Sequence, residues 1–203
     1  MFGFLTLIQE NPLVALLYGI SVILAIALHE AAHAYTANYL GDDTPRLQGR
    51  LTLNPMAHLD LIGTLLIFVI GFGWGKPVQF NPYNLKNPKR DTALIAVAGP
   101  TTNIILAVIS SLLLRLFGIQ LPMLSLFLTS FISLNVVLAV FNMVPLDPLD
   151  GFKVVRGLLP AKYLPDWDAT ARYGMFVLLF LLLTGVLWKI MNPFINILLG
   201  ILM

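Results

Sequence analysis

The chain has 203 residues, of which 58% are hydrophobic and 11% charged, and its formal net charge is +2. Soluble domains are nearer to about 45–50% apolar, so this composition excludes a soluble domain and predicts a multi-pass protein of the lipid bilayer. The chain contains no cysteine, which excludes disulfides and thiolate metal ligands. We expect residues 1–203 to form a single membrane domain without a cleavable signal peptide, and no nucleic-acid partner.

The first predicted membrane helix begins at Asn11-Pro12, where asparagine can cap the helix and proline suits its first turn. Gly41 is suited to end it. About 29 residues lie between Pro12 and Gly41, which corresponds to about 43 Å of helix and is longer than the hydrocarbon layer requires.

This helix contains His29-Glu30-Ala31-Ala32-His33, an H-E-x-x-H motif that follows the uncharged run 13–28. Residues four apart lie on one helix face, so both histidines can bind one tetrahedral zinc ion. Glu30 can accept a proton from a water molecule at the metal. Ionisable groups in hydrocarbon are costly and usually functional. The site is expected roughly 10 Å from the C-terminal end of the helix.

Three further segments are predicted to cross the membrane, and they cover 92–117, 122–144 and 173–187. The fold class is therefore all-α, with about four spanning helices. The final stretch 193–203 is too short to span alone, so we expect it to return part-way or to lie at the interface, within a C-terminal helical segment 173–203.

The segment 59–72 is apolar but has only 14 residues, a length typical of re-entrant or interfacial segments. Ten of the 12 lysine and arginine residues fall within 41–58, 73–91 and 151–172. These three segments share one side of the membrane only if 59–72 is re-entrant. The positive-inside rule makes that side cytoplasmic, so the histidine motif is expected near the cytoplasmic surface.

Two histidines require a third protein ligand. Asp147 and Asp150 are the candidates, because Pro145 and Pro148 break the third span at the expected depth of His33. Alternatively, the prolines simply end a helix and both aspartates are solvated.

Three motifs together resemble the site-2 protease family of intramembrane zinc metalloproteases. They are the H-E-A-A-H motif at 29–33, A-G-P-T-T-N at 98–103 and N-x-x-P-x-x-P-L-D-G at 142–151. The similarity covers about residues 20–160. The stretch G-F-G-W-G-K-P-V at 71–78 resembles the short branch of the family that has neither a PDZ nor a CBS domain.

The resemblance implies one zinc ion per chain, bound by His29, His33 and Asp150, with Glu30 as the catalytic base. It also places Asn103 and Asn142 near the site. Asn103 either helps to stabilise the oxyanion or positions the substrate backbone, or it only joins two helices, since it lies on a small-residue face that includes Gly99, Ala107 and Ser111. Asn142 has the same two possible roles. His58 and Asn135 are expected to be structural.

The expected substrate is a membrane protein with a transmembrane helix, cleaved after local unwinding, in a prokaryotic cell membrane. A short β element near the site is predicted to hold the unwound substrate by strand addition. Its edge is Lys76, Pro77, Val78, Gln79, Phe80 and Asn81.

Two other functions compete with proteolysis. A metal-binding transporter or channel also places carboxylates and histidines in the membrane, but here these groups converge on one cluster. A catalytically silent scaffold of the same fold is the other alternative, and the presence of Glu30 argues against it.

Overall fold

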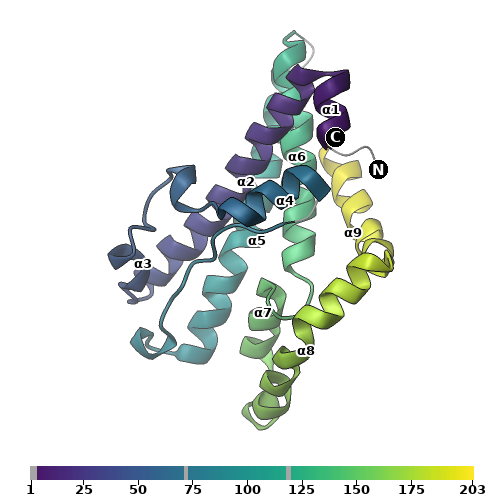
Figure 1. Ribbon diagram of the computed structural model, residues 1–203. Coiled ribbons are helices and arrows are strands. Elements are labelled where there is room, and N and C mark those ends of the chain that lie inside the picture. The colour runs from purple at the N-terminus through teal and green to yellow at the C-terminus, as the bar shows by residue number, and fades with distance from the viewer. Residues whose placement is uncertain (1–3, 71–72, 118–119) are drawn as a thin grey trace.

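The structure, a computed structural model, describes residues 4–70, 73–117 and 120–203. The described residues form α-helices joined by short loops and 3-10 turns (Figure 1). The helices are α1 (Phe4–Glu10), α2 (Pro12–Tyr39), α3 (Thr44–Leu47), α4 (Leu61–Ile70), α5 (Pro88–Phe117), α6 (Pro122–Asn142), α7 (Asp150–Leu158), α8 (Leu164–Leu183) and α9 (Val186–Leu202). The 3-10 turns are η1 (Pro55–Ala57), η2 (Pro82–Asn84) and η3 (Ala161–Tyr163).

Three long helices, α2, α5 and α6, pack against one another and form the centre of the molecule. Each is long and apolar enough to cross a bilayer. The buried face of α2 is rich in alanine, including Ala25, Ala34 and Ala37, which lets the neighbouring helices approach closely. The expectation of an all-α, multi-pass membrane protein is confirmed.

The ends of these helices follow local capping chemistry. Asn11 accepts a hydrogen bond from Val14 N at 3.2 Å, as predicted. Helix α5 begins at Pro88, four residues before the predicted start at residue 92. The difference arises because Asn87 caps the helix through Arg90 N, while Asp91 lies inside the first turn and accepts from Asn87 N.

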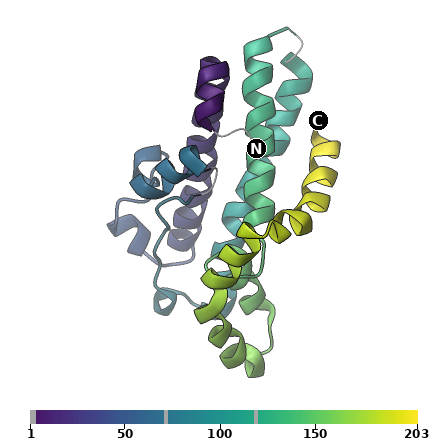
Figure 2. The same ribbon diagram turned by 45° about the vertical axis from the view of Figure 1, so that its right-hand side comes forward.

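The C-terminal region differs from the prediction. Helix α8 ends at Leu183, and the chain then bends by 79° into α9, so neither 173–187 nor 193–203 is a separate element. The bend lies at Gly185, whose φ of 70° suits glycine. The α8–α9 pair meets the length and hydropathy of a span only when both helices are counted together. Where the sequence predicts about four spanning helices, the described residues therefore hold three helices of spanning length and one bent pair, whose bend is visible in Figure 2.

The bent pair is attached to the bundle by apolar side chains. Helix α9 packs against α6, and a buried cluster extends from α5 and α6 to both α8 and α9. Its members are Ala107, Ile132, Val136, Leu149, Leu178, Leu187, Met191 and Ile195. This cluster provides a rigid support on the C-terminal side of the molecule.

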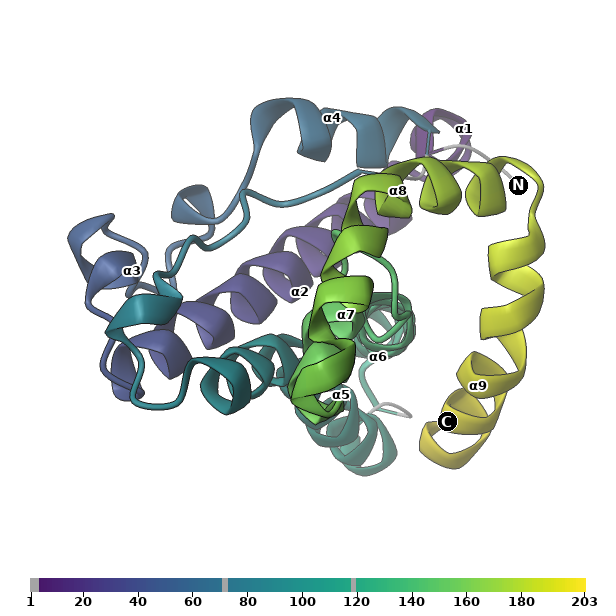
Figure 3. The ribbon, with the colours of Figure 1, turned by 90° about the horizontal axis from the view of Figure 1, so that it is seen from below.

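Helix α4 has ten residues, or about 15 Å of helix, which is half of a hydrocarbon layer of about 30 Å. The re-entrant placement of 59–72 stays a prediction, and residues 71 and 72 lie outside the described part. Seen from below, residues 73–81 run between α4 and α2 (Figure 3).

The predicted β element is not formed by the described residues. They contain one isolated antiparallel bridge, between Leu59 and Gly75, and no strand. Residues 76–81 are irregular, because beyond the bond from Lys76 N to the His58 carbonyl their bonded backbone groups contact side chains of other elements instead of a partner strand. Those bonds are described with the site below.

Candidate metal centre

The two histidines of the H-E-x-x-H motif lie one helical turn apart on the buried face of α2. His29 is 6% exposed and His33 is 8% exposed. Their rings meet edge to face, and the two Nε2 atoms are 3.0 Å apart. The i, i+4 spacing therefore brings two imidazole nitrogens to one point, as the sequence predicts.

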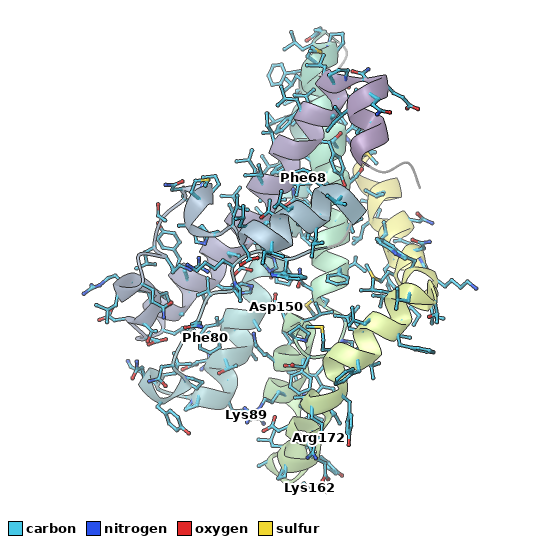
Figure 4. All side chains as sticks on the ribbon, in the orientation of Figure 1. Phe68, Phe80, Lys89, Asp150, Lys162 and Arg172 are labelled. Atoms are coloured by element: carbon cyan, nitrogen blue, oxygen red, sulfur yellow. The ribbon has the colours of Figure 1, made fainter. Side chains whose placement is uncertain are left out.

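Asp150 reaches the same point from the first turn of α7, near the middle of the molecule (Figure 4). Its Oδ2 lies 3.1 Å from His29 Nε2 and 3.2 Å from His33 Nε2. The turn after α6 folds tightly over Gly151, where a Cβ atom would lie 2.3 Å from the Met143 carbonyl oxygen. Glycine at this position therefore allows α7 to begin directly beneath the end of α6.

The outward nitrogen of each histidine is held by a different group. His29 Nδ1 donates to Asn103 Oδ1 at 2.6 Å, and His33 Nδ1 donates to the Ile95 carbonyl at 2.7 Å. Each bond places the ring proton on Nδ1, which leaves the Nε2 lone pair directed at the other ligand atoms. Both partners belong to α5, so this helix fixes the orientation of both rings.

The three inner atoms are all acceptors in this arrangement. The two Nε2 atoms and the Asp150 Oδ2 atom lie within 3.2 Å of one another, and with neutral imidazoles protonated at Nδ1 there is no donor between them. Such a group is repulsive unless a cation lies between its members. Ligands about 2.0–2.1 Å from a tetrahedral zinc lie about 3.3 Å apart, close to the observed separations. The donor set of two imidazoles and one carboxylate therefore fits zinc.

Gly99 lies against the ligand atoms. A Cβ atom at this position would be 2.5 Å from His33 Nε2 and 2.7 Å from His29 Nε2. A side chain there would fill the space beside both ligating nitrogens. At position 99, the small residue on this face of α5 therefore leaves room beside the two nitrogens, in addition to allowing close helix packing.

The predicted base, Glu30, contacts the irregular segment that follows α4. Its Oε2 accepts a hydrogen bond from Val78 N at 3.0 Å. We refer to residues 74–81 as the strap, because they run between α4 and α2 (Figure 3) and bond to Glu30 of α2 through Val78 N. A Cβ atom on Gly75 would lie 2.7 Å from Ile26 Cγ2 and 3.6 Å from Glu30 Cγ, so the strap lies directly on α2.

The far end of the strap is held by Asp42, which is fully buried. Its carboxylate accepts from Asn81 N at 2.7 Å, from Asn84 Nδ2 at 2.7 Å and from the Thr44 hydroxyl at 2.6 Å. Burial alone would raise the pKa of Asp42, but these hydrogen bonds outweigh it and hold the pKa below its usual value. Asp42 thus joins the end of α2 to the end of the strap.

The two predicted asparagines lie in different surroundings. Asn103 is fully buried, and its Nδ2 donates to Asn135 Oδ1 at 2.7 Å and to the Ala25 carbonyl at 3.4 Å. A chain of hydrogen bonds therefore runs from α6 through α5 to His29. Asn142 is half-buried and donates to the Leu138 carbonyl of its own helix at 3.0 Å.

The remaining candidates do not join the cluster. Among the described residues, the one group able to bind a metal consists of His29, His33 and Asp150, so Asp147 is not part of it. His58 is fully buried and its Nε2 bonds to the Thr52 carbonyl at 2.8 Å, which agrees with a structural role in the loop.

The chain is similar to several curated proteins. YwhC of Bacillus subtilis is 42% identical over 185 residues, which cover 85% of this chain and 84% of YwhC. Rip2 of Mycolicibacterium smegmatis is 30% identical over 183 residues, covering 81% of this chain and 66% of Rip2. MJ0392 of Methanocaldococcus jannaschii is 25% identical over 182 residues, covering 89% of this chain and 46% of MJ0392.

MJ0392 is named a zinc metalloprotease, and YwhC and Rip2 carry the same name in provisional form. No protein-family model matches the chain, and no solved structure matches it significantly. The identity to YwhC extends over most of both proteins, and the cluster of two histidines and one aspartate suits zinc. The chain therefore belongs to the site-2 protease family and is a zinc metalloprotease of the membrane.

Proposed function

We propose that this protein is an intramembrane zinc endopeptidase that cleaves transmembrane segments of other membrane proteins. The observation that carries the proposal is the group of three acceptor atoms at 3.0–3.2 Å, contributed by His29, His33 and Asp150 and placed beside Glu30 on an apolar helix. A site buried among membrane helices favours a substrate that is itself in the membrane.

In this proposal, His29, His33 and Asp150 hold the zinc ion. When bound, zinc would polarise the scissile carbonyl and increase the acidity of water. Glu30 accepts the proton of the attacking water and delivers it to the leaving amine. Asn103 acts by orienting His29, because its Oδ1 and both amide hydrogens already have partners on the protein. Asn142, at the end of α6, remains a proposed polar group near the site.

The strap remains the proposed edge for an unwound substrate, over a shorter length than the sequence suggests. The protein itself uses Val78 N and Asn81 N, as well as the carbonyls of Lys76 and Pro77. Within the described part of the chain, no backbone hydrogen bond engages Gln79 or Phe80. Strand addition is therefore proposed at these two residues.

A proline scan of the strap tests this edge. Gln79→Pro removes an N–H that Glu30 does not use, whereas Gln79→Ala keeps it. We expect proline to raise the KM for a transmembrane substrate several-fold more than alanine does, with unchanged zinc content. Equal behaviour of the two variants would contradict strand addition at this position.

We propose that residues 1–203 act as a single domain with the active site near the cytoplasmic surface. Basic residues support this orientation, since Lys89, Lys162 and Arg172 lie toward one end of the molecule (Figure 4). Single cysteines at Gln48, Asn87 and Asp166 should react from the cytoplasmic side, and one at Gln120 from the outside. Opposite labelling at Gln48 and Asn87 would contradict this topology.

Cleavage by Glu30→Gln tests the function itself. The protein is reconstituted in vesicles with a test peptide that spans the membrane. We expect the wild type to cleave the peptide and Glu30→Gln to lose about 10²–10⁴-fold of the rate, the usual contribution of a general base. The variant should keep its zinc. A silent scaffold or a transporter would give no cleavage with either protein, which would contradict the proposal.

A further inference from the structure

Arg50 is a buried cation bonded to main-chain carbonyls. Its side chain lies in the loop between α3 and η1, and the residue is 3% exposed. The guanidinium donates to the carbonyls of Ala57, Lys76 and Pro77, the last at 2.9 Å. Two of these carbonyls belong to the strap and the third to the 3-10 turn η1, which precedes α4. One side chain therefore joins the strap to η1.

The strap is placed by contacts immediately around those carbonyls. Lys76 N donates to the His58 carbonyl at 2.9 Å, and Val78 N donates to Glu30 Oε2 at 3.0 Å. Between these donors, Arg50 binds the carbonyls of Lys76 and Pro77. The peptide that carries the Val78 N–H is the one whose carbonyl belongs to Pro77. Arg50 and Glu30 therefore bind opposite ends of the same peptide group.

We propose that Arg50 is a positioning residue that orients the Pro77–Val78 peptide, so that its N–H holds the Glu30 carboxylate in place. The inference rests on the proposed function of Glu30 and extends it to the strap that contacts Glu30. Arg50 touches neither the ligand atoms nor the expected free edge at Gln79 and Phe80. Its effect on cleavage is transmitted through the strap.

The chemistry of the contact favours arginine over lysine. A planar guanidinium has five donors in a fixed fork and can serve three carbonyls at once, whereas an ammonium is a compact charge without this fork. The salt bridges found among the described residues do not include Arg50. Burial lowers the pKa of the guanidinium, and the nearby Glu30 carboxylate acts in the opposite direction. The cation is thus balanced by main-chain dipoles and by Glu30.

The first test measures strap placement and does not depend on catalysis. A single cysteine at Val78 keeps the backbone N–H, and the native chain has no cysteine. We expect Arg50→Ala to increase its rate of reaction with a water-soluble thiol reagent roughly tenfold, because the strap opens locally. Arg50→Lys should give an intermediate increase. The matched control is Arg46→Ala, an exposed arginine of the neighbouring helix α3 whose contact with Asp43 is 3.7 Å long.

The second test measures coupling between Arg50 and the Val78 N–H. Arg50→Ala should keep its zinc and lose roughly 100-fold in kcat, as expected for a misplaced catalytic group. Val78→Pro removes the same N–H, so Arg50→Ala should cause little further loss in that background. Arg50→Lys should recover part of the rate, which general destabilisation of the fold would not explain.

Three results would overturn the inference. They are unchanged cysteine labelling in Arg50→Ala, additive losses in the double variant, and loss of zinc together with the rate. If the wild-type protein itself does not cleave the test peptide, the proposed function fails. The labelling comparison of Arg50→Ala with Arg46→Ala still decides whether Arg50 positions the strap, so the two failures are distinguishable.

Discussion

The two sides of the active site are built in different ways. On the metal side, all three proposed ligands come from helices, and α5 fixes both histidine rings through Asn103 and the Ile95 carbonyl. On the side of Glu30, irregular backbone is held by side chains, through Arg50, Asp42 and Glu30 itself. If His29, His33 and Asp150 hold the zinc ion and Glu30 transfers the proton, as we propose, metal binding and proton transfer depend on separate sets of contacts. Zinc content and cleavage should therefore respond differently to substitutions on the two sides.

The largest effect is expected from removing a metal ligand. His29→Ala, His33→Ala and Asp150→Ala should each release zinc and abolish cleavage, because each leaves only two ligands for the ion. Asp147→Ala and His58→Ala should keep full zinc, since neither belongs to the cluster. Zinc is measured by atomic absorption on purified protein. Full zinc in Asp150→Ala would show that the metal side is built from other residues.

A methyl group at Gly99 is expected to have the next largest effect. Gly99→Ala would place Cβ 2.5 Å from His33 Nε2, so a ligand must move. Overpacking of this kind costs about 2–3 kcal/mol, or roughly 100-fold in zinc affinity. The control is Gly200→Ala in α9, where no atom lies within 4 Å of the added Cβ. Competition with a zinc chelator measures both variants, and equal affinities would contradict the placement of Gly99 beside the ligands.

Smaller, graded effects are expected along the hydrogen-bond chain behind His29. Asn103→Ala removes the direct partner of the ring and should weaken zinc binding about 10–100-fold. Asn135→Ala removes a partner of Asn103 and should cost only a few-fold. The chelator assay ranks the two variants. A larger loss in Asn135→Ala than in Asn103→Ala would contradict transmission along this chain.

The metal side could be predicted from the sequence because helix periodicity determines it. The spacing of His29 and His33, and the apolar run before them, establish both a helix and a shared ligand face. The resemblance to the site-2 protease family selected Asp150 over Asp147, which spacing alone left open. The breaks after α6 were also predictable, since Pro145 and Pro148 end the helix on the way to Asp150.

The strap and the C-terminal bend could not be predicted in the same way. Arg50 appeared in the sequence only as one of the basic residues that set topology, because nothing local marks a guanidinium that binds three distant carbonyls. The apolar pattern of 173–187 continued across Gly185, so it gave no sign that φ there is positive and that the helix is broken. In both cases the structure depends on contacts between elements, which periodicity does not encode.

X-ray absorption spectroscopy at the zinc edge tests the central claim most directly, because it reports the number and type of atoms bound to the metal. The account predicts one zinc per chain with two imidazole nitrogens and oxygen ligands at about 2.0–2.2 Å, in four-coordinate geometry. The chain has three histidines, so a third imidazole in the spectrum would mean that His58 binds the metal. That result, or the absence of zinc from active protein, would contradict the site assigned to His29, His33 and Asp150.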